Sequence, residues 1–82
     1  MDLTKHLGAA IKRHRELLRL SQEELADRAQ MDRSYVGGIE RNTRNPSVKN
    51  LQKIADALGS DLDVLFATAR EIARGAATES EA

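Results

Sequence analysis

The chain has 82 residues, which is enough for a single domain. Hydrophobic residues make up 40% and charged residues 32%, a composition too apolar for a disordered chain. The longest apolar run, residues 64–67, is far shorter than the ~20 residues that span a bilayer, and the N-terminus lacks a signal-peptide pattern. From these two observations we expect a cytoplasmic protein with no membrane partner. Because there is no cysteine, disulfides and cysteine-based metal sites are excluded.

Charge is balanced overall but unevenly distributed along the chain. The 13 basic and 13 acidic side chains exclude a uniformly basic nucleic-acid coat. Residues 41–55, however, hold four basic and no acidic residues, and residues 56–82 hold six acidic and two basic ones. A solvated helix face would explain this pattern, and so would a local binding surface for nucleic acid.

Apolar residues recur at steps of three and four along the chain, which predicts an all-α protein without strands. The first helix is expected over about residues 3–19. Its inner face comprises Leu3, Leu7, Ala10, Ile11, His14, Leu17 and Leu18, and the opposite side carries Lys12, Arg13, Arg15 and Arg19. A second, shorter helix over about residues 22–29 is predicted by Ser21 and Glu24, whose spacing is that of a capping box.

A third helix is predicted over about residues 33–41, with Asp32 as its N-cap. It stops at Asn42, a residue type that tolerates the left-handed conformation of a helix end. Within it lie Gly37 and Gly38, which cost about 1 kcal/mol each relative to alanine. Two such residues in succession indicate that another group approaches the helix closely there.

Two more helices are predicted beyond Pro46, which keeps Asn45 out of the helical region. Ser47 can cap a helix over about residues 48–58, with an apolar face of Val48, Leu51, Ile54, Ala55 and Leu58. The last helix is expected over about residues 61–74, ended by Gly75, with residues 76–82 as a flexible acidic tail. The prediction is a compact five-helix bundle in one domain, residues 1–75.

The second and third predicted helices are joined by residues 30–32, a turn too short for an antiparallel hairpin, so they must cross at a steep angle. This arrangement is a helix-turn-helix, whose second helix enters the major groove of DNA. Ala26 is small where the helices would cross, and Val36 and Ile39 would anchor the second helix from beneath. The outward face of that helix would then carry Arg33, Ser34, Gly37 and Arg41.

Residues 22–41 and the continuation Arg44-Asn45-Pro46-Ser47 resemble the phage-repressor-like, or XRE, helix-turn-helix family, whose fold is the lambda-repressor-like DNA-binding domain. Residues 32–41 followed by Arg44 and Asn45 look most like controller proteins of restriction–modification systems. The resemblance covers about residues 5–66. Gln30 and Asn42 depart from it, since the family usually has glycine at both positions.

The resemblance implies a sequence-specific, DNA-binding transcriptional regulator. Base reading would fall to Arg33, whose paired donors suit a guanine edge, with Ser34 and Gly37 beside it. Contacts to DNA phosphates, which fix the register, would fall to Gln22, Tyr35, Arg41, Arg44, Asn45, Lys49 and Asn50. A solvated surface arginine is the alternative for Arg33, and structural support of the helix is the alternative for Tyr35.

The last predicted helix carries an apolar stripe that serves either the core of one chain or a dimer seam. We expect part of it to form a dimer interface, because the first four helices can bury their own apolar faces and because members of the family commonly pair through their last helices. The predicted interface residues are Leu65, Phe66, Ala69 and Ile72. Such a two-fold homodimer would hold its recognition helices ~34 Å apart on a palindromic operator.

The sequence offers no catalytic constellation, and we expect no enzyme, cofactor, metal or small-molecule ligand. Glu40 is expected to pair with a neighbouring arginine, and His6 and His14 have no further obvious metal ligand beside them. Double-stranded DNA is the expected partner. RNA polymerase is a further candidate, through the acidic residues Asp56, Asp61 and Asp63.

The leading interpretation is therefore a regulator that binds operator DNA, with a self-regulating restriction–modification controller as its most specific form. An antitoxin-type or prophage repressor is the alternative within the same class. A protein–protein adaptor built on a helix-turn-helix scaffold is the alternative from another class, because fold alone does not determine function.

Overall fold

The computed structural model describes residues 3–81, and of residues 77–81 only the backbone. Five helices follow one another: α1 (Thr4–Leu17), α2 (Gln22–Ala29), α3 (Arg33–Glu40), α4 (Val48–Ala57) and α5 (Leu62–Glu81). The part of the chain that is described contains no strand, so the predicted all-α, five-helix fold is confirmed. None of these five helices combines the length and the apolar character that crossing a membrane requires.

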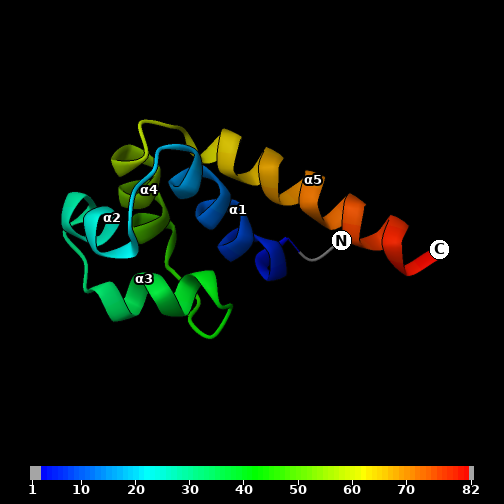
Figure 1. The fold of residues 1–82 in the computed structure, drawn as a ribbon, viewed down its shortest axis with the longest axis horizontal. Coiled ribbons are helices and arrows are strands. Elements are labelled where there is room, and N and C mark those ends of the chain that lie inside the picture. Colours follow the sequence, from blue (N-terminus) through cyan, green and yellow to red (C-terminus); the bar gives the residue numbers. More distant parts are fainter. Residues whose placement is uncertain (1–2, 82) are drawn as a thin grey trace.

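Helices α5 and α3 lie on opposite sides of the bundle (Figure 1). Between them runs α1, which packs most extensively against α5 and also contacts α3. Helix α2 packs against both α3 and α4 at one end of the molecule, and the C-terminal part of α5 extends beyond the other helices at the opposite end. As a result, α3 has one side against α1 and α2 and its other side on the surface.

Every helix contributes to the core, and the largest fully buried side chain of each helix is aliphatic. These five side chains, all less than 2% exposed, are Ile11, Leu25, Ile39, Ile54 and Leu65. Burying a side chain of this size contributes about 1.5–3 kcal/mol. Since each helix shields the others' apolar side chains from water, we expect the five helices to unfold together.

Side-chain caps confirm three predicted helix starts. The Ser21 hydroxyl accepts a hydrogen bond from the Glu24 N–H, and the Glu24 carboxylate accepts one from the Ser21 N–H, both at 3.0 Å. The hydrogen bond from the Ser21 N–H to the Glu24 carboxylate, together with the contact to the Ser21 hydroxyl, lowers the pKa of Glu24 below its usual value. Asp32 accepts from the N–H of the second residue of α3, and Ser47 accepts from that of the third residue of α4.

At the C-terminal end of α1 and at the first residue of α4, three residues predicted to face the core are exposed instead. Leu17 is 73% exposed and Leu18 49% exposed, although helical periodicity assigns both to the inner face. The helix ends at Leu17, and Arg19 then takes a left-handed φ of 57°, so that Leu20 enters the core in their place. Val48 is 72% exposed because it is the first residue of α4 and precedes the turn that faces the core.

Gly75 does not end the last helix, contrary to the prediction. The backbone of α5 continues through it to Glu81. Nothing lies within 4 Å of the position that a Cβ on Gly75 would occupy, so neither a neighbour nor a left-handed φ marks a stop there. A glycine in an exposed helix weakens the helix without terminating it, and alanines follow at once. Residue 82 and the side chains of residues 77–81, part of the predicted tail, lie outside what is described.

Gly8 lets α1 approach α3 backbone to backbone. A Cβ at this position would collide with the carbonyl oxygen of Ile39 and lie 2.8 Å from that of Glu40. The close crossing brings α1 against the C-terminal turn of α3. The spacing of apolar residues does not predict this contact. A lone glycine inside a strongly helical segment, however, indicates a close approach of another group.

Gly8→Ala is expected to lower the free energy of unfolding by about 1–3 kcal/mol, because the added methyl group has no space against rigid backbone. Urea denaturation followed by circular dichroism measures the change. Gly75→Ala is the matched control, since it makes the same substitution in open space, and should raise the free energy of unfolding by up to about 1 kcal/mol. Equal effects of the two substitutions would contradict the close crossing.

Candidate nucleic-acid interface

Helices α2 and α3 form a helix-turn-helix in the structure. Ala26, which is 1% exposed, lies at the crossing, and its carbonyl oxygen accepts a hydrogen bond of 2.8 Å from the N–H of Met31. Gln30 takes a left-handed φ of 58° in the turn, and Asn42 takes one of 62° after α3, so both positions have the conformation that the family usually gives to glycine. On the outward face of α3, Arg33, Ser34 and Arg41 are exposed.

The inner side of α3 is held by a buried carboxylate. Glu40, whose side chain is 3% exposed, accepts hydrogen bonds from Arg15 Nε at 2.7 Å and Nη2 at 2.9 Å, and from Gln22 Nε2 at 3.0 Å. Arg15 Nη1 also donates to the Leu20 carbonyl oxygen at 2.8 Å. The Glu40 carboxylate raises the pKa of Arg15 above its ordinary value. We call Arg15, Glu40 and Gln22 the polar clamp, because they join α1, α3 and α2.

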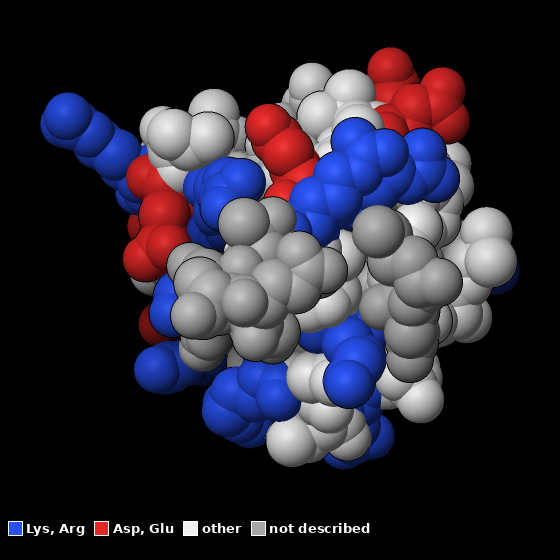
Figure 2. All heavy atoms as spheres, turned by 90° about the vertical axis from the view of Figure 1, so that its right-hand side faces the viewer, with Lys and Arg blue, Asp and Glu red and all other residues white. Residues whose placement is uncertain are grey.

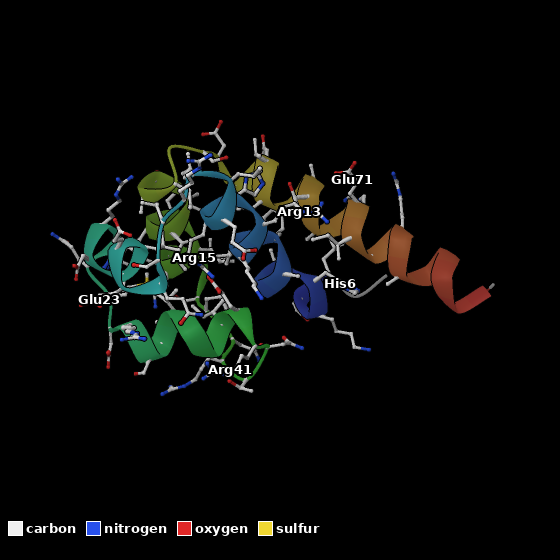
Figure 3. The ribbon with its side chains drawn as sticks, in the orientation of Figure 1. His6, Arg13, Arg15, Glu23, Arg41 and Glu71 are labelled. Carbon is white, nitrogen blue, oxygen red and sulfur yellow. The ribbon has the colours of Figure 1, made fainter. Side chains whose placement is uncertain are left out.

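The polar clamp confirms one prediction and corrects another. Glu40 pairs with an arginine, as expected. Arg15 does not lie on the exposed side of the first helix, since its side chain is 11% exposed and points into the molecule (Figure 3). Gln22 is also half-buried. Its amide nitrogen donates to Glu40, and its amide oxygen makes no bond to the Glu40 carboxylate.

The loop after α3 packs onto Gly38. The backbone N–H groups of Thr43 and Arg44 donate to the Gly38 carbonyl oxygen at 2.8 and 3.2 Å, and the Thr43 hydroxyl donates to it at 3.1 Å. A Cβ on Gly38 would lie 2.5 Å from Cγ of Arg44. Gly38 is therefore required by the protein's own loop, and the group that approaches α3 closely at this position is Arg44.

Tyr35 links α3 to the loop and to α4. Its hydroxyl oxygen accepts a hydrogen bond of 3.0 Å from the Asn50 side-chain amide, and the Arg44 guanidinium lies 5.8 Å from the centre of its ring. Tyr35 is half-buried, as in the support role considered for it. Because Asn50 uses the oxygen as acceptor, the hydroxyl proton stays available for an outside acceptor such as a phosphate.

The N-terminal end of α3 makes only exposed contacts. Arg33 Nη1 lies 4.0 Å from Glu23 Oε2, and both side chains are more than two-thirds exposed, a geometry that contributes little to stability. The Ser34 hydroxyl donates to Asp32 at 3.1 Å. Arg33 therefore has a full set of guanidinium donors to offer to a ligand.

Arg41 lies at the lower face of the molecule in Figure 3, below the polar clamp. Lys and Arg side chains gather along the lower edge of the face in Figure 2, on the side where α3 lies in Figure 1. The exposed residues Arg44, Asn45 and Lys49 follow α3 in the chain. Gly37 is buried beneath the side chains of Arg41 and Gln22, so its own atoms are not open at the surface.

The residues predicted for a dimer seam do not share one surface. Leu65 and Ala69 are fully buried in the core of the single chain, so they cannot contact a second copy, and this part of the prediction is wrong. Phe66 and Ile72 are half-buried and lie about 120° apart around α5. Phe66 lines a groove with residues of α1, α3 and α4, and Ile72 lines another with residues of α1.

The histidines do not form a ligand cluster. His14 Nε2 lies 2.8 Å from the hydroxyl of the buried Thr68, so His14 joins α1 to α5. Among the side chains that the structure describes, those of residues 3–76, no group of three or more His, Asp or Glu is placed to hold a metal ion.

The chain is similar in sequence to helix-turn-helix regulators. Residues 11–65 match the family described as helix-turn-helix. The control protein C.MunI of a Mycoplasma species is 41% identical over 66 residues, which cover 79% of this chain and 89% of that protein. The immunity repressor of Bacillus phage phi105 is 39% identical over 59 residues, 72% of this chain, but the chain spans only 41% of that repressor's length.

Solved structures give the same likeness. The restriction–modification controller protein C.AhdI from Aeromonas hydrophila has a TM-score of 0.73 at 45% identity, with 78% of this chain and 96% of that chain covered. The controller protein C.Esp1396I, solved as a tetramer in complex with its natural 35 base-pair operator, has a TM-score of 0.78 at 34% identity, with 87% and 93% covered.

Glu40→Ala is expected to lower the free energy of unfolding by about 3 kcal/mol or more, because it leaves Arg15 buried without its partner. The double variant Arg15→Met, Glu40→Leu removes both charges at similar volume and should be much less destabilised than Glu40→Ala. Glu23→Ala, which breaks only the exposed pair with Arg33, is the control and should change stability by about 0.5 kcal/mol or less. Thermal and urea unfolding measure all three, and a cost for Glu40→Ala no larger than for Glu23→Ala would argue against the clamp.

Proposed function

The chain belongs to the helix-turn-helix family and is a DNA-binding regulator of that family, and from this premise we propose that it binds a palindromic operator as a homodimer to control transcription. The observation that carries the proposal is the arrangement of α3. Its inner side is fixed by the polar clamp, while Arg33, Ser34 and Arg41 on its outward face are exposed. A helix held in this way can enter a major groove as a rigid body.

Base reading begins with Arg33. Its guanidinium is 68% exposed and its contact to Glu23 is long, so little is lost when it turns toward a guanine edge. Paired donors from arginine to O6 and N7 of guanine are the commonest specific contact in the major groove. Ser34, bonded to the helix cap, can add a contact to a base or to a phosphate.

Phosphate contacts come from groups that flank α3. The free hydroxyl proton of Tyr35 and the exposed side chains of Arg44, Asn45 and Lys49 are suited to this role, as is the N-terminus of α4. Gln22 and Asn50 each use one amide N–H in an internal hydrogen bond, and the second N–H of each amide is the donor left for a phosphate. These contacts set the register of α3 on the duplex.

The homodimer would form through the groove lined by Phe66, Pro46 and the exposed Val48. This groove also includes residues of the loop after α3. If the two-fold axis of this dimer is perpendicular to the duplex, both copies of α3 face the same side of the DNA, as a palindrome requires. The operator complex of C.Esp1396I, which contains four copies of that protein, supports binding by more than one copy.

Regulation of a restriction–modification system is the most specific form of this proposal, because the control proteins C.MunI and C.AhdI resemble the chain over most of its length. Dimerisation makes operator occupancy rise steeply with protein concentration, which suits a self-regulating switch. We propose that the protein acts in the cytoplasm by binding alone, without catalysis, and that RNA polymerase is its second partner at the promoter.

Selection of bound duplexes from a random pool at about 150 mM salt tests the function, because this salt suppresses purely electrostatic binding. We expect an enriched palindrome with half-sites one helical repeat, or a multiple of it, apart. Arg33→Ala should cost about 1–3 kcal/mol of binding free energy and relax the preference at one base pair per half-site. Arg44→Gln, which keeps most of the side-chain stem over Gly38, should weaken binding to all sequences and lower the salt slope by about one per lost contact.

If Arg33→Ala and Arg44→Gln behaved alike, the division between reading and positioning would be wrong. If no sequence were enriched at all, the chain would be better explained as a protein–protein adaptor. Arg70→Ala, an exposed change on α5, is the control and should leave the selected sequence unchanged.

Val48→Glu is expected to shift the protein from dimer to monomer at micromolar concentrations in analytical ultracentrifugation, because it places a charge in the proposed groove. The chain should still fold, since Val48 is exposed in the first turn of α4, where a negative charge suits the helix dipole. Val64→Glu is the matched control in the first turn of α5, and should leave the dimer intact. The reverse result would move the interface to the other side of α5.

A further inference from the structure

Gly37 lies in the middle of α3, yet internal packing does not require a glycine there. A Cβ on Gly37 would meet only the ends of two side chains, Arg41 Nη1 at 3.0 Å and Gln22 Oε1 at 3.3 Å. At Gly8 the same atom would meet backbone oxygens, and at Gly38 it would meet the stem of Arg44. Because glycine weakens a helix interior, a role at the surface is the better explanation for Gly37.

The space over Gly37 holds the guanidinium of Arg41. Residue 41 follows residue 37 by one helical turn, so its side chain can run back along the outward face of α3. Nη1 and Cζ of Arg41 lie 3.0 and 3.8 Å from the missing Cβ position. Arg41 is exposed whereas Gly37 is buried beneath it. The guanidinium therefore lies across the middle of the outward face, where a side chain at position 37 would otherwise stand.

Gln22 completes this space, which we call the notch (Gly37, Arg41 and Gln22). Because Gln22 Nε2 donates to Glu40, the polar clamp directs Gln22 Oε1 toward Gly37. An amide oxygen accepts hydrogen bonds, and a guanidinium only donates them. In the notch, the acceptor Gln22 Oε1 lies on the same side of Gly37 as the Arg41 guanidinium, which is a donor. This arrangement favours the observed position of Arg41.

We propose that Arg41 is a base-reading residue in addition to Arg33, and that the notch holds its guanidinium against a guanine edge in each half-site. This inference rests on the proposed function and deepens it. An arginine that contacts a phosphate needs no missing side chain in the recognition helix, because phosphates line the walls of the groove. The middle of the outward face, in contrast, meets base edges, and the arginine fork matches O6 and N7 of guanine.

The test compares binding profiles over all single base-pair variants of the selected operator. Arg41→Lys keeps the charge but loses the paired donors, so the salt slope of binding should stay the same. Discrimination at one base pair per half-site should fall about tenfold or more. Arg44→Lys, the matched control in the loop, should leave the base preference unchanged at every position.

Gly37→Ala tests the notch itself. The methyl group meets only the tips of the Arg41 and Gln22 side chains, and a thermal melt followed by circular dichroism checks that the variant is folded. Discrimination should fall at the same base pair that Arg41→Lys affects. This shared position distinguishes a notch for Arg41 from a general loss of fit between α3 and DNA.

Two results would overturn the inference. If Arg41→Lys weakened binding to all sequences equally, or left the profile unchanged, Arg41 would contact only phosphates, and the proposed function would stand without it. If Gly37→Ala left the profile unchanged, the notch would not position Arg41 on a base. A wild-type protein that selected no sequence would overturn the proposed function as well, so the two failures are distinguishable.

Discussion

The buried carboxylate of Glu40 joins three helices at one point, and the position of the recognition helix depends on it. Its oxygens accept hydrogen bonds from Arg15 on α1 and from Gln22 on α2, all at 3.0 Å or less. A charge removed from water in this way is tolerated only when it is fully bonded, so the three helices are restricted to an arrangement that keeps all these bonds. Gly8 strengthens this restriction, because it lets α1 approach the carbonyl groups of the same turn of α3.

This inner restraint explains why the outward face of α3 can be almost free of internal bonds. Val36 and Ile39 are buried beneath the helix, so packing and the clamp together fix its position without using its outer side chains. Arg33 keeps only a long, exposed contact to Glu23. Stability and recognition are thus assigned to opposite sides of one short helix, and a ligand can engage one side without disturbing the other.

Much of the fold could be predicted from the sequence because helical periodicity and capping residues act locally. Ser21, Asp32 and Ser47 mark their helix starts as expected. Periodicity fails at the C-terminal end of α1, where Leu17 and Leu18 are exposed, because helical phase shows which residues share a face but not how far along the helix that face is covered. It also cannot show that Arg15 turns inward, since its partner Glu40 lies 25 positions later and only tertiary packing brings the two together.

The candidate site shows the same limit of prediction from sequence, because neighbouring residues of one type serve different purposes in the structure. Gly37 and Gly38 look alike in sequence, but Gly38 makes room for the stem of Arg44, whereas only the tips of side chains lie over Gly37. Leu65 and Phe66 belong to one apolar stripe, but Leu65 is in the core and Phe66 lines a groove at the surface. A pattern of residue types identifies which positions are apolar or small. The three-dimensional neighbours decide whether each serves the chain itself, a second copy or DNA.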